Sequence, residues 1–279
     1  MKLPINMRDY IIATHNRGTK FIDWAGFEPE PVEVAIAVEE HRWFWKPETV
    51  RLILVAESHV YTTEHDFSYH LDVDKMKSLL DGTHFVQGHN QPAPIREYVG
   101  LIYCLAYGDK MLLLPNSNPE IQHDDGTRKL SARGTPQYWG QVFSPLAGVT
   151  SLGFEWKIKI LEGLYRKGIW LLDASVHAIY RGEGKKVKDK DQLHVQWWDG
   201  YGKHIMQPGN QAHVWVIGKG VYKALTSIRN DFAQMVSGCI SQPNARLTNE
   251  ERAKEMEPLL ELAASLPNNN KDGKANIVI

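Results

Sequence analysis

The chain has 279 residues, of which 43% are hydrophobic and 23% charged, and its formal net charge is −1. This composition is that of a folded globular protein and argues against a disordered or membrane-spanning chain, and the charge gives no sign of a strongly basic surface. The start, MKLPINMRDY, lacks the basic and apolar regions of a secretory signal, so we expect a cytoplasmic protein that binds no membrane. Cys104 and Cys239 form no CxxC pair, which indicates two reduced, buried thiols.

Four apolar segments have the length and composition of strands buried on both faces, which is typical of a parallel sheet covered by helices. They are residues 51–57, 168–174, 212–218 and 235–241. An apolar stripe at helical spacing predicts a helix over 154–168 that ends at Gly168, and a further helix is predicted over 220–236. Each helix leads into the next strand, as crossover connections in a parallel sheet do.

The last predicted helix begins at a capping box formed by Thr248 and Glu251, and Pro258 is expected to bend or split it. We therefore predict one α/β domain, a three-layer α/β/α sandwich around a short, mainly parallel four-stranded sheet. The domain is predicted to span residues 1–265, with its core over 48–247 and an insertion within that core at about 62–150. A flexible tail over 266–279 follows it.

Ligands of such sheets bind outside the carboxyl ends of the strands, so the residues that follow each strand are the candidates for a site. Asp173 is the most informative, because an acid beside Leu171 and Leu172 is expected to be desolvated. A structural explanation stands beside the functional one: a glutamate after a strand is often a salt-bridged group, and Asp173 is alternatively a paired structural acid. The candidates after the four strands are Glu57, Ser58 and His59; Asp173; Lys219; and Gln242 and Asn244.

Four short segments resemble, in order and spacing, the motifs of the uracil-DNA glycosylase superfamily. They are Ala56-Glu57-Ser58-His59, Leu171-Leu172-Asp173-Ala174, Val216-Ile217-Gly218-Lys219 and Gln242-Pro243-Asn244. The resemblance implies a DNA glycosylase that needs no cofactor or metal and takes DNA as its partner. The chain departs from the family where Ala56 replaces a glycine, Asp173 an asparagine and Gln242 a histidine.

Within this resemblance, Glu57 is expected to stabilise the positively charged sugar and to activate water, with Ser58 and His59 as helpers. Gln242 can donate a hydrogen bond to the departing base but cannot carry a positive charge. An ionised Asp173 can only accept hydrogen bonds, which suits the N4 amine of cytosine and opposes the O4 of uracil. An enzyme that cuts cytosine must spare its host genome. The expected substrate is therefore a modified cytosine, such as the hydroxymethylated and glucosylated bases of some phages, and the family contains a phage-defence glycosylase of this kind.

Aromatic and basic residues complete the predicted DNA site. Tyr61, Phe67 and Tyr69 are candidates to stack on the flipped base. The Gly-punctuated segment 181–192 is either a phosphate-contacting loop or a solvated one. The residues expected to contact DNA are Lys185, Lys186, Lys219, Asn244 and Arg246.

No lysine is positioned by a motif for Schiff-base chemistry, so we expect a monofunctional, monomeric glycosylase that leaves an abasic site. Two alternatives stay open: a uracil-excising repair enzyme, and a non-catalytic nucleic-acid-binding protein of the same fold. The segment EHDFSYHLDVD over 64–74 holds potential metal ligands, but its spacing fits no metal-site pattern, and a solvated acidic loop is favoured.

Overall fold

A four-stranded, entirely parallel sheet forms the centre of the protein, as predicted. The computed structural model describes residues 2–22, 29–83, 95–108, 112–114, 136–149, 154–180, 187, 189–206 and 211–268. The strands are β1 (Leu52–Ala56), β2 (Ile169–Asp173), β3 (His213–Ile217) and β4 (Val236–Ile240), in the spatial order β2-β1-β3-β4. Each lies within one of the four apolar segments that predicted it. β1 and β2 are buried throughout, as expected of strands covered on both faces, but β3 begins at the exposed His213 and β4 is only partly buried before Ile240.

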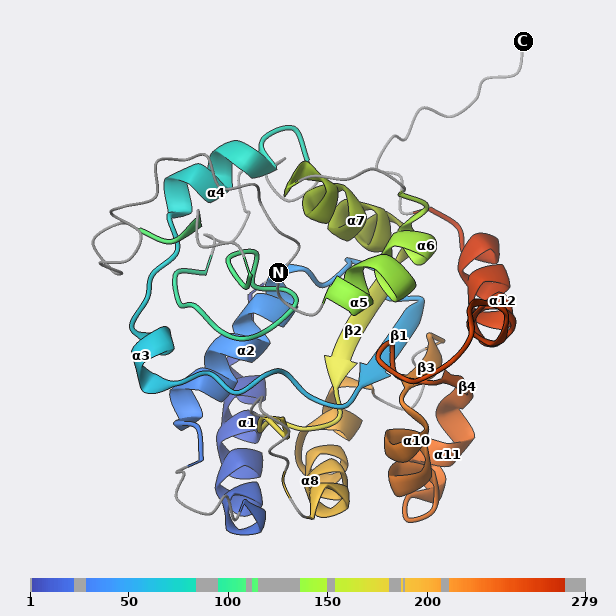
Figure 1. Cartoon of the computed structure of the whole chain (residues 1–279). Coiled ribbons are helices and arrows are strands. Elements are labelled where there is room, and N and C mark those ends of the chain that lie inside the picture. The colour runs from blue at the N-terminus through green and yellow to red at the C-terminus, as the bar shows by residue number, and fades with distance from the viewer. Residues whose placement is uncertain are drawn as a thin grey trace.

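Helices cover both faces of the sheet and make the three-layer α/β/α sandwich (Figure 1). One layer consists of α5 (Pro136–Tyr138), η5 (Trp139–Phe143), α6 (Ser144–Ala147), α7 (Phe154–Lys167) and α12 (Asn249–Ser265). The other consists of α1 (Ile5–Gly18), α2 (Val32–Phe44), α8 (Lys190–Trp197) and α10 (Lys219–Thr226). Shorter elements are η1 (Thr19–Phe21), α3 (Glu64–Phe67), α4 (Val73–Leu80), η6 (Trp198–Gly202), α9 (Lys203–Ile205) and α11 (Asn230–Met235).

The turn from α7 into β2 depends on Gly168. This residue has a φ of 73°, in the left-handed region that favours glycine. A Cβ atom at this position would lie 2.6 Å from the carbonyl oxygen of Thr49. The predicted helix end is therefore confirmed, and glycine is required there for both its conformation and its close approach to a neighbouring backbone.

Two helix predictions differ from the structure. The predicted helix over 220–236 is two helices, because Arg229 adopts an extended conformation between α10 and α11. Its guanidinium pairs with Asp199, and the next helix is held by a hydrogen bond from the Trp198 indole to Asp231 (3.0 Å). The helix α12 begins at the predicted capping box and runs through Pro258 without a break, so the predicted split does not occur.

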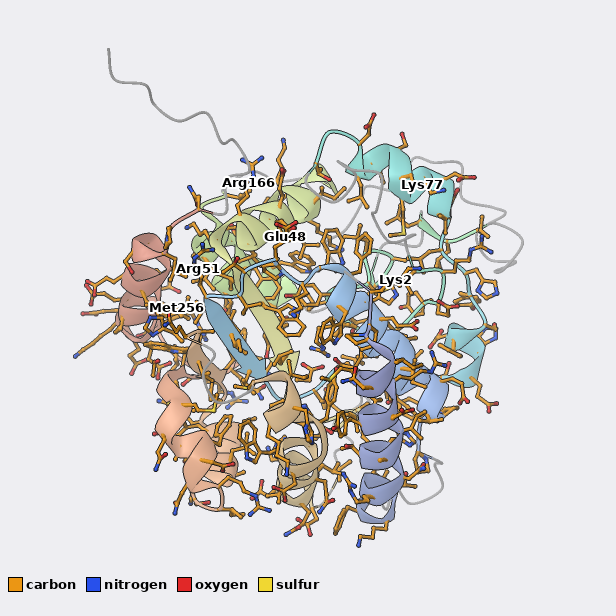
Figure 2. The ribbon with its side chains drawn as sticks, turned by 180° about the vertical axis from the view of Figure 1, so that it is seen from behind. Lys2, Glu48, Arg51, Lys77, Arg166 and Met256 are labelled. Carbon is orange, nitrogen blue, oxygen red and sulfur yellow. The ribbon has the colours of Figure 1, made fainter. Side chains whose placement is uncertain are left out.

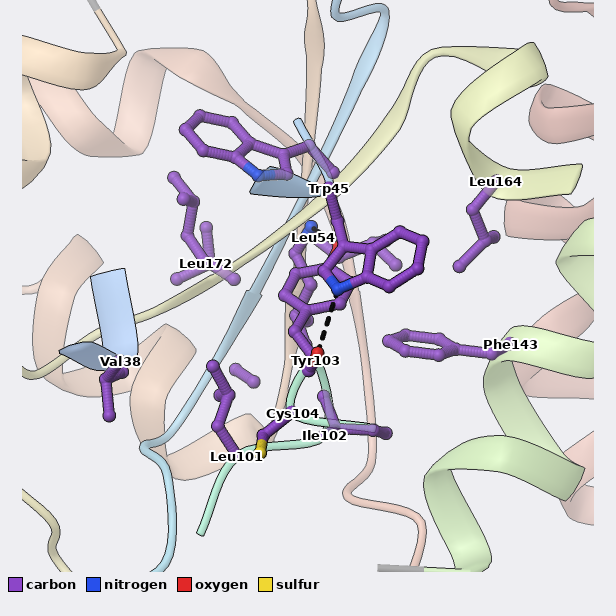
Figure 3. Packing of buried hydrophobic residues seen from close by; sticks show 14 of the residues in the cluster. Val38, Trp45, Leu54, Leu101, Ile102, Tyr103, Cys104, Phe143, Leu164 and Leu172 are labelled. Carbon is purple, nitrogen blue, oxygen red and sulfur yellow. Dashed lines mark hydrogen bonds between the residues drawn. The ribbon is translucent and has the colours of Figure 1, made fainter. Parts of the chain in front are cut away.

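The core continues from the sheet into the segment that follows β1. Figure 3 shows the Trp45 indole next to Leu54, where its nitrogen donates a hydrogen bond to the carbonyl oxygen of Tyr103 (2.8 Å). Phe143 and Leu164, from the layer of α7, pack nearby. This packing places residues 101–104 of the predicted insertion against the sheet, close to the carboxyl end of β1.

Polar side chains cover the outer edge of β2, beyond which no further strand lies among the described residues. The Leu171 amide donates to the Tyr103 hydroxyl (2.9 Å), and the Leu171 carbonyl accepts from Arg42 (3.3 Å). Tyr103 and Arg42 are both buried. The backbone amide and carbonyl of Leu171, which a further strand would pair with, therefore already have hydrogen-bond partners within the chain.

Charged side chains such as Lys77 and Arg166 lie at the periphery, where each pairs with an acid of its own helix (Figure 2). In the described part of the chain, no helix has the length and apolar character needed to cross a membrane. Both cysteines are free thiols; Cys104 is buried as predicted, whereas Cys239 is only partly buried. Most of the predicted tail lies outside the described residues.

Candidate functional site

Glu57 and Gln242 meet at the carboxyl ends of β1 and β4. The Gln242 amide donates to Oε2 of Glu57 (2.8 Å). This approach depends on Gly218, which has a φ of 118° and on which a Cβ atom would lie 3.1 Å from Cγ of Gln242. Two residues that the sequence places 185 positions apart thus form one contact.

Lys190 holds the other oxygen of Glu57. It is the first residue of α8, and its Nζ lies 2.6 Å from Oε1 of Glu57. Burial by itself would raise the pKa of Glu57, but the hydrogen bonds from Lys190 and Gln242 outweigh it and lower the pKa below its usual value. Glu57 is therefore an ionised, oriented carboxylate with 16% of its side chain exposed.

Asp173 ends β2 in a buried ion pair. Its Oδ2 accepts from the guanidinium of Arg42 (2.8 Å) and lies 3.7 Å from Nδ1 of His59. Burial would raise the pKa of Asp173, but Arg42 and His59 lower it, so the carboxylate is ionised although only 3% of the residue is exposed. Both of these contacts go to Oδ2, which leaves Oδ1 to accept a hydrogen bond from a bound group.

His59 links Asp173 to a second buried acid, Glu30. Nε2 of His59 lies 3.0 Å from Oε2 of Glu30. Oε2 also accepts from the backbone amide of Ala178, and Oε1 of Glu30 accepts from the backbone amide of Thr62. Burial would lower the pKa of His59, but Glu30 and Asp173 raise it to about 9. His59 is therefore a buried imidazolium that supports Asp173, rather than a group free to contact DNA.

Asp173 and His59 line a small pocket of about 30 Å³. The pocket is also lined by Ala56, Ser58, Val60, Gly100, Leu101, Ile102, Tyr138 and Leu171. Its volume holds one or two water molecules and is about a tenth of that of a typical ligand pocket. Several lining residues come from the predicted insertion, which thus forms one wall.

Tyr138 is the aromatic residue of this pocket. Burial raises the pKa of its hydroxyl, and the charges of Asp173 and Glu57 raise it further. Tyr138 and Asp173 line the same pocket. The three aromatic residues predicted to stack on a base, Tyr61, Phe67 and Tyr69, do not line this pocket. Tyr61 packs on Ile179 and its neighbours, Phe67 packs on the main core, and the Tyr69 hydroxyl bonds to His65 (2.7 Å).

The remaining predicted residues are spread around this site. The Ser58 hydroxyl donates to the carbonyl of His59 (2.9 Å) and accepts from the Ile179 amide (3.0 Å), so it ties the end of β1 to the segment after β2. Lys219 is exposed and pairs with Glu255 (2.6 Å). Asn244 and Arg246 are exposed, and the predicted DNA-contacting Lys185 and Lys186 lie outside the described residues.

His194 is a further site residue that the sequence motifs did not indicate. Its ring Nδ1 bonds to the carbonyl of Ala174 (2.7 Å), which fixes the tautomer with the proton on that nitrogen. The other nitrogen, Nε2, is buried and has no hydrogen-bond partner among the described residues. Within the same residues, no three His, Cys, Asp or Glu side chains are arranged to hold a metal ion.

The site thus combines an oriented carboxylate, an amide donor and an amine with a second carboxylate that lines a pocket. Such a set can stabilise a developing cation and can accept a hydrogen bond from a bound amine. Comparisons of the chain with family models, curated proteins and solved structures gave no match.

Proposed function

We propose that the protein is a DNA glycosylase that hydrolyses the N-glycosidic bond of a flipped-out modified cytosine and leaves an abasic site. It acts as a monomer on DNA in the cytoplasm. The observation that carries the proposal is the ionised Glu57 at the end of β1, held by Gln242 from the end of β4. Two of the residues that the family resemblance selects, from segments far apart in the sequence, are in contact.

Glu57 supplies the main chemical contribution. Loss of a base from deoxyribose passes through a sugar with oxocarbenium character, and a fixed carboxylate stabilises this charge and orients the attacking water. The Gln242 amide fixes the orientation of Glu57, since it donates to Oε2 (2.8 Å). Because glutamine, unlike the family histidine, cannot carry a positive charge, more of the transition-state stabilisation must come from the Glu57 carboxylate.

Asp173 supplies the base preference. Its ionised carboxylate, held by Arg42 through Oδ2, presents an acceptor to the pocket. The N4 amine of cytosine satisfies this acceptor, whereas the O4 of uracil would face it with a second acceptor. Restriction to a modified cytosine protects host DNA, and it suits a role in defence against phages that carry such bases.

Base binding requires the pocket to widen. A volume of about 30 Å³ accommodates water but no base. Tyr138 lines the pocket together with Asp173, so its ring is the candidate to stack on a flipped base once the pocket opens.

The test is base release, measured by mass spectrometry, from two DNA pools. One carries uracil, and the other carries 5-hydroxymethylcytosine and glucosylated cytosine. We expect free modified cytosine from the wild type, a loss of at least about 100-fold in Glu57→Gln, and no change in the control Glu257→Gln, whose residue is exposed on α12.

Two results would contradict the proposal. Release of uracil alone would refute the role of Asp173 and favour a uracil-excising repair enzyme. No release from either pool, with DNA binding retained, would favour a non-catalytic nucleic-acid-binding protein.

A further inference from the structure

We infer that Lys190 gives this site a second activity, the cleavage of the DNA strand at the abasic site through a Schiff base. The inference rests on the proposed function, because its substrate is the sugar that base removal leaves behind. No sequence motif places a lysine at the site, yet the fold brings Nζ of Lys190 to 2.6 Å from Oε1 of Glu57.

The position of Glu57 determines what Lys190 can reach. A carboxylate that stabilises the sugar cation lies close to C1′, so an amine in contact with that carboxylate is also within reach of C1′. The Lys190 side chain is 33% exposed, so it is not sequestered in the core. Once the base has left, C1′ is the aldehyde carbon of the ring-opened sugar, with which a primary amine condenses.

A neutral base lies on the same face of α8 as Lys190. His194 lies four residues further along α8, on the same face of the helix. Its Nε2 is buried and unprotonated, since Nδ1 carries the ring proton that bonds to the Ala174 carbonyl. Burial also lowers the pKa of His194, so the ring is a neutral base and not a second cation beside Lys190.

The reaction is balanced without an oxidant or reductant. The Lys190 ammonium gives a proton to Glu57 or to His194, and the free amine adds to C1′ to form a carbinolamine. The proton held by Glu57 or His194 passes to the C1′ hydroxyl, which leaves as water; this gives the iminium ion and restores the Glu57 carboxylate. The Glu57 carboxylate then removes a proton from C2′, the electron pair forms the C2′–C3′ double bond, and the C3′–O bond breaks with release of the phosphate. Water hydrolyses the iminium and restores Lys190.

Trapping with sodium borohydride tests this chemistry directly. The full-length protein is incubated with a duplex that already contains an abasic site, so that no base release is needed. Borohydride adds hydride to an iminium and leaves a stable secondary amine. We expect a protein–DNA adduct whose cross-linked peptide contains Lys190. An adduct on another amine, or no adduct, would overturn the inference.

Matched variants separate this residue from other lysines. Lys190→Arg keeps a cation beside Glu57 but cannot form an imine, and it is expected to lose at least 90% of the adduct and of the strand cleavage. Lys223→Arg changes an exposed lysine of α10 and is expected to retain both. Equal adduct yields from the two variants would contradict the role of Lys190.

The same samples distinguish this inference from the proposed function. Base release without an adduct on abasic DNA would leave the glycosylase proposal intact and refute the Schiff base. An adduct at Lys190 without base release from either DNA pool would support the amine chemistry and refute the glycosylase proposal.

Discussion

Replacement of Arg42 by methionine tests whether this buried residue compensates the charge of Asp173, the proposed base-reading acid. Arg42 is fully buried and donates to Glu39 (3.0 Å), to the Leu171 carbonyl (3.3 Å) and to Asp173 (2.8 Å). Methionine retains much of the apolar stem and removes the charge. Two buried carboxylates then lose the cation between them, and only Asp173 keeps a second cationic neighbour, His59.

Removal of one partner from a buried ion pair costs about 3–5 kcal/mol of stability, because the remaining charge is left desolvated. With an m-value of about 3 kcal/mol/M, the midpoint of urea unfolding is expected to fall by about 1–2 M. The loss should shrink at low pH, because the two carboxyl groups lose their charge when they take up protons.

Arg8→Met is the matched control. Arg8 pairs with Glu40 at 3.4 Å, but the two side chains are 44% and 30% exposed, so the loss of this pair costs about 1 kcal/mol or less. Unfolding is followed by circular dichroism in urea at pH 7 for the wild type and both variants. Midpoints of Arg42→Met and Arg8→Met that agree within about 0.3 M would refute the view that Arg42 compensates buried charge.

Three further predictions concern pH, backbone and stacking. The pKa of His59 is about 9 in the folded protein and about 6.5 in the unfolded chain, so its contribution to stability is complete below about pH 6.5 and is lost as the pH rises through about 9. Urea unfolding of the wild type at pH 6.5 and 9.5 should show this loss of stability. An equal loss in His59→Gln would contradict the prediction. Gly168→Ala is expected to cost at least about 1 kcal/mol more than Gly82→Ala, since both have a positive φ but only Gly168 has an atom within 3 Å of the added Cβ; equal midpoints in thermal unfolding would count against this account. If Tyr138 stacks on the base, Tyr138→Ala should slow single-turnover base release about 5- to 150-fold, whereas Tyr138→Phe should retain it, and equal rates in the two variants would argue against stacking.

The sheet could be predicted from the sequence, and the helix layer only in part. Strands buried on both faces need apolar side chains throughout, and this requirement marks β1 and β2 most clearly, whereas β4 lies in an apolar segment but is only partly buried. The break between α10 and α11 leaves no such mark, because it depends on a pairing of Arg229 with Asp199, which lies 30 residues earlier. Local periodicity predicts a helix on either side of Arg229 but cannot detect this tertiary contact.

The site residues also fall into those that the sequence indicates and those that only the fold reveals. Glu57, Asp173 and Gln242 could be found because the carboxyl ends of parallel strands gather at one edge. Arg42 and Lys190 could not, because they come from helices that lie 131 and 133 residues away from the acids they bind. Lys190 belonged to a basic segment predicted to contact phosphate or solvent, and only the fold shows that it faces Glu57.

At the outer edge of β2, one side chain both holds Asp173 and covers a backbone carbonyl that could otherwise pair with another chain. Arg42 bonds to Asp173 and to the Leu171 carbonyl with different nitrogens of one guanidinium. A motion that swings Arg42 away to release the acid would also bare a backbone acceptor on an outer strand, where a foreign strand can dock and start aggregation. The proposed role of Asp173 and the protection of this sheet edge against a foreign strand therefore depend on the same side chain.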